Sequence, residues 1–278
     1  MTNTDHHLHP ILAFAEATAR EAGALLRRAY RQPIDIDYKG TINLVTQADR
    51  DSEAAIVAAI QARYPDHAIL AEEGSGDGNH SSPDGLTWLI DPLDGTTNFA
   101  HRFPVFAVSL ALRDSSDVLL GVVYDPLRDE CFTALRGQGA KLNGEPIRVS
   151  TVEEIGRALL ATGFPYDRQE AVDNNSAAFA AFLRRAQGIR RGGSAAMDLA
   201  YVACGRFDGY WEMRLNPWDW GAGLLLVREA GGVVTHYDGR DDLDSIFGEA
   251  KLAASNGRIH AAILATLAEV YAQRVADP

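Results

Sequence analysis

Apolar residues recur along this chain at two different spacings, which separate the expected helices from the expected strands. Residues 11–30 place them on one helical face, where Thr18 is the one polar residue, and Thr46 is positioned to cap a second helix that ends at Tyr64-Pro65. Strand-like runs follow at 69–71, 87–91, 105–112, 118–124 and 130–134, with a turn at Asp125-Pro126 and a tight hairpin at Asn143-Gly144. The first half is therefore predicted to pack helices on a largely antiparallel sheet.

The pattern changes after about residue 150. Short apolar strands now alternate with helices: strands are expected at 158–161, 207–213, 233–235 and 252–254, and helices at 176–185, 195–204, 218–229 and 259–270. Such alternation is typical of an α/β arrangement. No linker or repeat separates the approximate halves 10–150 and 151–275, so we expect residues 1–278 to form one unit with its site between them.

Composition narrows the class of protein. The chain has 278 residues, of which 46% are hydrophobic and 23% charged, as in a soluble globular enzyme. No apolar run approaches the roughly 18–20 residues of a membrane helix. The N-terminus, with His6, His7 and His9, lacks the apolar core of a signal peptide, so we expect a frayed tail and a cytoplasmic protein. Cys131 and Cys204 are expected to be buried free thiols.

The formal net charge of −12 argues against a nucleic-acid backbone as a direct ligand. It does not exclude a small phosphate ester, because bound metal ions can invert the local field.

Chemistry concentrates at the end of the expected strand 87–91. Asp91 ends the strand, Asp94 follows three residues later, and Gly95, Thr96 and Thr97 supply a flexible turn, hydroxyls and amides at an expected helix start. Two carboxylates beside a nest of donors are typical of a site for a hard cation and a phosphate. No Lys or Arg occurs between Trp88 and His101, so a divalent metal is the expected counter-charge.

Other acids occupy comparable positions. Glu72-Glu73 follow the expected strand 69–71, Asp49 lies in the first turn of the second helix, and Asp219 begins a later one. Acids in a first helical turn also complement the helix macrodipole, and acids after strands are often solvated loop residues. Taken singly, such structural roles account for each acid at least as well as a site does.

Two long stretches resemble the inositol monophosphatase family. One is Trp88-Leu89-Ile90-Asp91-Pro92-Leu93-Asp94-Gly95-Thr96-Thr97-Asn98-Phe99, and the other is Trp218-Asp219-Trp220-Gly221-Ala222-Gly223, continuing to Glu229-Ala230-Gly231-Gly232. Glu72-Glu73 and Gly193-Ser194-Ala195 match two further steps of the family, and the resemblance extends to Ala254-Ser255-Asn256-Gly257. It implies a layered α-β-α-β-α sandwich of mixed α+β and α/β class, a homodimer, and a magnesium-dependent, lithium-sensitive phosphatase.

The resemblance also implies roles for individual residues. Glu72, Asp91 and the Leu93 carbonyl match the ligands of a first Mg²⁺, Asp91, Asp94 and Asp219 match those of a second, and a third, weaker ion lies near Glu72. Thr96, assisted by Asp49, matches the pair that orients and deprotonates the attacking water, while the metals activate that water and stabilise the leaving alkoxide. Asp91 as an aspartyl nucleophile is disfavoured, because a carboxylate bridging two metals is too well neutralised.

At the substrate end, the amides of Gly95 and Thr96 would hold phosphate oxygens, and Asp94, Gly193, Ser194, Ala195 and Glu212 match residues that contact a polyol. Phe164-Pro165-Tyr166 would shape the pocket wall or simply pack. Arg190-Arg191 are expected to form surface or dimer ion pairs rather than to bind a second phosphate. Lys39-Gly40-Thr41 resembles the family's mobile loop, whose lysine lies near the third ion, but a surface lysine is an equal alternative. In that loop Asn43 replaces the more usual acid.

The first-ranked activity is hydrolysis of a small polyol phosphate monoester, namely myo-inositol 1-phosphate. The alternatives are a sibling phosphatase, acting on histidinol phosphate, fructose 1,6-bisphosphate or 3′-phosphoadenosine 5′-phosphate, and a regulatory protein with a non-catalytic role in transcription.

Overall fold

The computed structural model describes residues 5–33, 36–38, 44–74 and 85–276. A seven-stranded sheet has the order β3-β4-β5-β6-β7-β8-β9. Its strands are β3 (Ala68–Ala71), β4 (Thr87–Asp94), β5 (Ala107–Arg113), β6 (Val118–Asp125), β7 (Glu130–Leu135), β8 (Ala140–Leu142) and β9 (Glu145–Pro146). β3 and β4 are parallel and the other neighbours are antiparallel. The sheet is therefore largely antiparallel, as predicted for the first half.

The second sheet has five strands in the order β11-β10-β12-β14-β13. They are β10 (Leu159–Thr162), β11 (Gly188–Arg190), β12 (Gly209–Met213), β13 (Val233–Thr235) and β14 (Lys251–Ser255). β10 is parallel to both β11 and β12, which fits the expected α/β alternation. β14 is antiparallel to β12 and β13, so this sheet is mixed.

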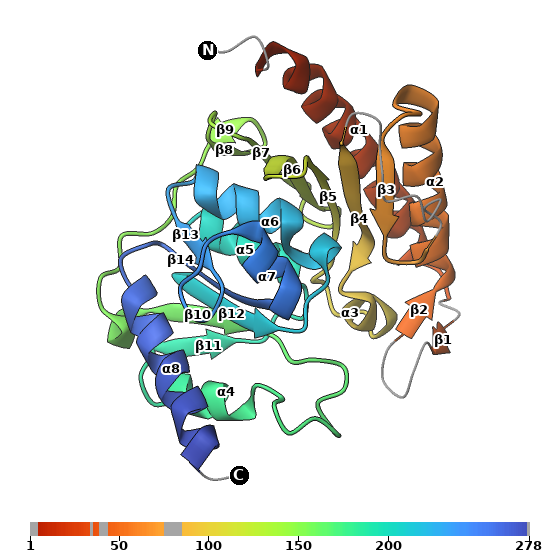
Figure 1. Ribbon diagram of the computed structural model, residues 1–278. Helices are drawn as coiled ribbons and strands as arrows, with labels where there is room; N and C mark the ends of the chain where they lie inside the picture. Colours follow the sequence, from red (N-terminus) through yellow and green to blue (C-terminus); the bar gives the residue numbers. More distant parts are fainter. Residues whose placement is uncertain (1–4, 34–35, 39–43, 75–84, 277–278) are drawn as a thin grey trace.

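Helices cover both sheets and fill the space between them (Figure 1). The helices are α1 (Asp5–Ala29), α2 (Gln47–Arg63), α3 (Thr96–Ala100), α4 (Ser176–Leu183), α5 (Ala195–Ala203), α6 (Pro217–Glu229), α7 (Leu243–Glu249) and α8 (His260–Ala276). α1 and α2 share a hydrophobic cluster with β4 to β7, and α4 and α8 share another with the five-stranded sheet. The predicted α-β-α-β-α sandwich is confirmed.

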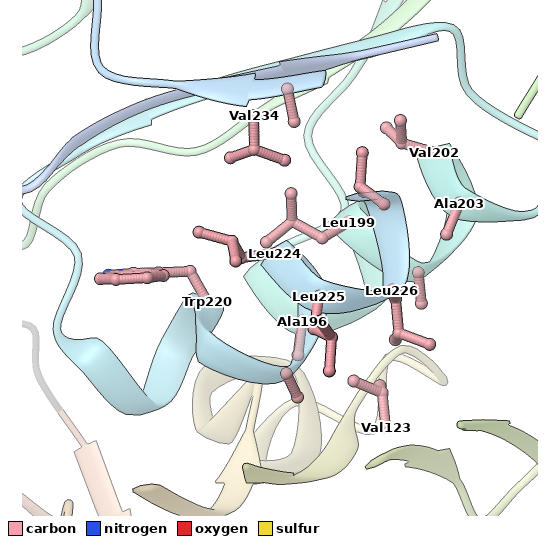
Figure 2. Close-up of a cluster of buried hydrophobic side chains, with 14 of the residues drawn as sticks. Val123, Ala196, Leu199, Val202, Ala203, Trp220, Leu224, Leu225, Leu226 and Val234 are labelled. Carbon is pink, nitrogen blue, oxygen red and sulfur yellow. The ribbon is translucent and has the colours of Figure 1, made fainter. Parts of the chain in front are cut away.

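The central layer consists of α5 and α6, which pack against both sheets. Figure 2 shows Ala196 and Leu199 of α5 beside Leu224 and Leu225 of α6, with Val123 of β6 on one side. The approach of α6 to β6 is close: a Cβ placed on Gly121 would lie 2.9 Å from the Cα and the carbonyl oxygen of Ala222. Because α5 and α6 begin at the same end of this layer, their first turns lie near the end of β4.

Several short elements escape the sequence pattern. These are the two-stranded sheet of β1 (Ile36–Tyr38) and β2 (Leu44–Thr46), strand β11, helix α7, and the 3-10 turn Ile155–Arg157. Each is too short for its apolar spacing to stand out. The expected helix start at Gly95–Thr97 is present as α3, and the Asn143-Gly144 hairpin joins β8 to β9.

Two predictions for the termini and the thiols need correction. α1 begins at Asp5, so His6, His7 and His9 belong to a helix rather than to a frayed tail. Leu8 packs against the hydrophobic cluster that α1 and α2 share with β4 to β7, and this contact extends the helix towards the N-terminus. Cys131 is a buried free thiol, and burial raises its pKa to about 12, but Cys204, just after α5, is only half-buried.

Among the helices of the described residues, none combines the length and the apolarity needed to cross a membrane.

Candidate active site

The carboxyl end of β4 carries the first two acids of the site. Asp91 is 2% exposed, and its Oδ1 accepts a hydrogen bond of 3.0 Å from the Leu93 amide. The pairing of β4 with β5 shifts register between Asp91 and Asp94. Such an irregularity re-aims side chains at the end of a strand. Both carboxylates can therefore face the same side of the sheet edge.

Glu72 and Asp219 join these acids from β3 and α6. A pocket of about 100 Å³ is lined by all four carboxylates together with Leu93 and Thr96. Burial raises the pKa of Asp91 well above its usual range, and the charges of Glu72, Asp94 and Asp219 raise it further. The pKa of Asp219 is also raised, first by burial and then by Glu72 and Asp94. Four acids that destabilise one another's charged forms fit a site for a cation.

The carboxylates are close but do not converge on a common point. Within the described residues, no three His, Cys, Asp or Glu side chains form a ready-made metal site. Each inner acid instead turns an oxygen to a backbone amide: Asp91 to Leu93, Asp94 to Ala196 at 2.7 Å, and Asp219 to Asn216 at 2.6 Å. A carboxylate has two oxygens, so each keeps one for a hard cation, and the donor set of oxygens alone suits Mg²⁺.

Thr96 and Asp49 meet at the inner side of the acid cluster. The Thr96 hydroxyl lies 2.9 Å from Asp49 Oδ1 and 3.1 Å from the Leu93 carbonyl, so its one hydrogen can be donated to either. Asp49 is fully buried, and its Oδ2 accepts the Thr46 amide at 2.8 Å, which starts α2 with a capping box. Burial raises the pKa of Asp49, while hydrogen bonds from Thr46 and Thr96 oppose that shift.

Gly95 allows β4 to turn directly into α3. Its φ of +100° lies in the left-handed region, and a Cβ there would be 2.9 Å from the Val105 carbonyl oxygen. Only glycine meets both conditions without strain. Thr96 consequently follows Asp94 after a single residue and reaches Asp49.

A larger cavity of about 440 Å³ opens beside the acid-lined pocket. The residues that the two share include Asp94, Glu212 and Asp219, so a single ligand can extend from one into the other. Gly193, Ser194, Ala195 and Glu212, predicted to contact substrate, all line the larger cavity.

Asp94 connects the two halves of the chain at this cavity. Its Oδ2 accepts hydrogen bonds of 2.7 Å from both the Ser194 hydroxyl and the Ala196 amide at the start of α5. Burial raises the pKa of Asp94 to about 6, and these hydrogen bonds oppose the shift. Asn98 adds a second link, since its amide nitrogen lies 2.7 Å from the Val105 carbonyl oxygen and 2.8 Å from that of Gly192.

Glu212 lines both the larger cavity and the acid-lined pocket. It lies on β12, and the Tyr210 hydroxyl donates a hydrogen bond to its Oε2. A Cβ on Gly163 would overlap the Glu212 carboxyl group, so the glycine makes room for it. Burial raises the pKa of Glu212 to about 7, opposed by the Tyr210 hydrogen bond and by the charge of Arg191.

The structure adds residues that the sequence did not indicate. Asp198, Arg168 and His101 also line the larger cavity. Asp198 is the one charged residue in the otherwise apolar stretch of α5, and that isolation is the signal that could have singled it out. Arg190 and Arg191 are exposed, as the surface interpretation predicted, and Arg191 also lines the larger cavity. Within the described residues neither arginine forms an ion pair, and an ion pair across a dimer stays a prediction.

Two loop predictions have different outcomes. Phe164, Pro165 and Tyr166 line the pocket, as the pocket-wall interpretation predicted, and Phe164 packs against Phe179 with ring centroids 5.7 Å apart. Lys39-Gly40-Thr41 and Asn43 lie outside the described residues, so their predicted role near a third ion stays a prediction.

Comparison with known proteins gives a consistent picture. The model of the "Inositol monophosphatase family" matches residues 7–273. The chain is 48% identical to "Inositol-1-monophosphatase" of Synechocystis sp. over 258 residues, covering 92% of this chain and 88% of that protein. It is 44% identical to "Nus factor SuhB" of Escherichia coli (strain K12) over 262 residues, covering 94% and 96% respectively.

Solved structures agree with the sequence matches. The inositol monophosphatase of Anabaena (Nostoc) sp. superposes with a TM-score of 0.85 at 44% identity, covering 95% of this chain and 97% of that one. The Thermotoga maritima IMPase has the same TM-score at 35% identity, covering 95% and 99%. The similarity spans nearly the whole chain and every predicted site residue.

Proposed function

This chain belongs to the inositol monophosphatase family, and from that premise we propose that it hydrolyses a small polyol phosphate monoester, with myo-inositol 1-phosphate as the first candidate. The observation that carries the proposal is the pair of joined pockets. The smaller is lined by Glu72, Asp91, Asp94 and Asp219, and Glu212 lines both the smaller and the larger. A phosphate held with cations in the first would place its alcohol part in the second.

The acid-lined pocket fits divalent metal. Glu72, Asp91, Asp94 and Asp219, with the Leu93 carbonyl, would hold two Mg²⁺, and a third would bind more weakly near Glu72. When bound, the ions supply a lowered pKa of water and charge stabilisation at the leaving oxygen. We also expect Li⁺ to inhibit at the position formed by Asp91, Asp94 and Asp219.

The residues of the chain orient the reaction around that pocket. The Thr96 hydroxyl can donate to Asp49 while its lone pairs accept a hydrogen bond from the attacking water. The raised pKa of the buried Asp49 makes it a better proton acceptor than an exposed aspartate. Gly95 and Thr96 amides would contact the phosphoryl oxygens, which fixes the phosphorus opposite the water.

The direct test is a substrate panel with Mg²⁺ and with chelator. It contains myo-inositol 1-phosphate, histidinol phosphate, fructose 1,6-bisphosphate and 3′-phosphoadenosine 5′-phosphate. The proposal expects the highest kcat/KM on the inositol ester and none without metal. A preference for either bisphosphate would contradict it, and would fit Arg168 and Arg191 in the larger cavity as a second phosphate site.

Glu212→Gln tests the polyol assignment by itself. The carboxylate would accept charge-assisted hydrogen bonds from substrate hydroxyls, each worth about 1.5–3 kcal/mol. We expect kcat/KM on myo-inositol 1-phosphate to fall about 10-fold or more beyond any fall on phenyl phosphate, as those energies require. Equal losses on both esters would assign Glu212 a structural role instead.

A non-catalytic role in transcription is the second candidate, because the chain is 44% identical to a protein named "Nus factor SuhB". Asp91→Asn in the producing cell separates the two. A cellular phenotype that the inactive variant fully restores would favour the regulatory role. By family likeness we further expect a homodimer, which sedimentation of the purified protein checks.

A further inference from the structure

Asp198 is a buried carboxylate on the wall of the larger cavity. It lies in the first turn of α5, is 3% exposed, and lines the cavity together with Glu212 and Arg191. Within the described residues its side chain has no hydrogen-bond partner. A buried polar group without a partner is costly, and one that faces a cavity is satisfied when a ligand fills it.

The orientation of α5 explains why Asp198 faces the cavity. Ala196 and Ala203 belong to the central core cluster that α5 shares with α6 (Figure 2), and Ala200 belongs to it as well. Residue 198 is about 200° around the helix from residue 196, so it points away from that contact. An aspartate here therefore contributes little to the packing of α5 on α6.

The position of the carboxylate is built in the same way as that of Glu212. Gly192 lies directly beneath Asp198, because a Cβ on Gly192 would be 2.6 Å from Asp198 Oδ1. Gly163 lies against Glu212 in the same manner. Asp198 and Glu212 thus each pack against a glycine that leaves room for the carboxyl group, and both line the same cavity.

Charge at this end of the cavity is balanced only in part. Arg191 is close enough to Asp198, Glu212 and Asp94 to lower the pKa of each. Burial raises the pKa of Asp198 well above its usual range, and the negative charges of Glu212 and Asp94 raise it further. Of the two arginines that line the cavity, Arg168 and Arg191, neither is hydrogen-bonded to Asp198 within the described residues, so the carboxyl oxygens of Asp198 remain available to a ligand that donates hydrogen bonds.

We propose that Asp198 is a specificity-determining residue, whose carboxylate accepts a hydrogen bond from a hydroxyl on the alcohol part of the substrate. It is a second acceptor beside Glu212, so that two hydroxyls of one polyol are bound from two walls. The inference rests on the proposed phosphatase function and adds to it a preference for cyclic polyols, which can present two hydroxyls at once.

The experiment compares wild type and Asp198→Asn on myo-inositol 1-phosphate and on phenyl phosphate. A hydroxyl contact made equally in the ground state and the transition state affects KM more than kcat. We expect KM on the inositol ester to rise about 10-fold or more, in line with a hydrogen bond lost at a buried group, and to exceed any rise on phenyl phosphate by that factor. Asp244→Asn, an exposed acid in the first turn of α7, controls for loss of helix-start charge.

A set of mono-deoxy inositol 1-phosphates identifies the hydroxyl. For wild type, removing the hydroxyl that contacts Asp198 should cost as much as Asp198→Asn does, whereas the variant should be indifferent to that removal. Gly192→Ala is the second variant. It keeps the charge but displaces the carboxylate, and should reproduce the discrimination loss of Asp198→Asn.

The outcomes separate this inference from the proposed function. If wild type fails on all polyol phosphates, the proposed function is wrong and the inference falls with it. If wild type hydrolyses the inositol ester but Asp198→Asn loses equally on both esters, or on neither, the inference alone is overturned. If Asp198→Asn loses activity only on the phosphate ester of an amino alcohol, the assignment of Asp198 to a substrate hydroxyl is also overturned.

Discussion

At the scale of single residues, Asp91 combines deep burial with three like-charged neighbours. We expect Asp91→Asn to lower turnover by more than about 100-fold, because it removes a charge that two metal positions share. We also expect the metal-free variant to be at least as stable as wild type at neutral pH. Its raised pKa in the folded state means that the ionised Asp91 opposes folding.

Turnover at saturating Mg²⁺ and urea unfolding in chelator measure the two effects. Turnover within about tenfold of wild type, about 1.4 kcal/mol, would remove Asp91 from the metal assignment. A fall in the urea midpoint would show that weakening the hydrogen bond from the Leu93 amide, which an asparagine oxygen accepts less strongly than a carboxylate does, matters more for folding than the repulsion does.

Thr96→Val tests the water-orienting role of a hydroxyl without changing the shape of the side chain. The variant loses the hydrogen bond to Asp49, so we expect kcat to fall about 100-fold or more, the typical range for a general-base contribution, while Mg²⁺ affinity stays within a few-fold. Metal titration followed by activity and by calorimetry makes the comparison. Collapse of Mg²⁺ affinity would instead make Thr96 part of the metal shell.

The residues of the site differed in how far the sequence could indicate them. Asp91, Asp94 and Asp219 stand in long distinctive motifs, so their proximity was expected. Asp198 was missed because a carboxylate in a helix has no local signature, and Arg191 was weighed only as the less favoured binder of a second phosphate because an arginine after a strand has none either. Whether they line the cavity depends on which way α5 and β11 face, and that orientation is set by packing on α6 and by pairing with β10 rather than by the neighbouring sequence.

At the scale of elements, α6 approaches β6 so closely that Gly121 has no room for a side chain. Gly121→Ala would press a methyl group against the backbone of Ala222, which cannot rotate away. We expect a destabilisation of about 1–3 kcal/mol from overpacking. Turnover should also fall, because α6 carries Asp219.

Gly156→Ala is the matched control. Its nearest atom would be the Arg185 carbonyl oxygen at 3.8 Å, an ordinary contact, so stability should be unchanged or slightly higher. Thermal or urea unfolding of both variants gives the comparison. Equal stability of Gly121→Ala and wild type would mean that the central layer can shift without cost.

Elements whose own residues show a clear apolar pattern were predictable, and elements without one were not. β13 was expected at 233–235 and occurs there, and α5 and α6 differ from their expected bounds by a single residue at one end. β11 has one apolar residue in three positions, so nothing local distinguishes it from a loop. It forms because β10 offers it an edge, which is a tertiary effect.

At the scale of the whole molecule, the mutual repulsion of the site acids makes stability depend on cations. Mg²⁺ at about 100 times its Kd should stabilise the fold by about 2.7 kcal/mol. That corresponds to a rise in Tm of about 5–10 °C for a chain of this size. Melting curves with Mg²⁺ and with chelator measure it, Asp91→Asn should abolish most of the shift, and an unchanged Tm in wild type would contradict the metal site.

The layered order of the molecule could not be derived from periodicity, which predicts which faces are apolar but not which faces meet. The resemblance supplied that order, and the three hydrophobic clusters bear it out. The antiparallel position of β14 likewise depends on the path of the chain between sheets, which leaves no trace in its five residues.

The hydrogen bonds from Ser194 and Ala196 to Asp94 join residues 100 and 102 positions apart. Closing so long a loop costs more chain entropy than pairing β5, β6 and β7, which are neighbours in sequence. During refolding the sheets can therefore form before the two halves dock, and catalysis should return later than the circular dichroism of the backbone. Activity in this protein therefore reports the completion of folding, since a partly assembled chain has its secondary structure but is catalytically inactive.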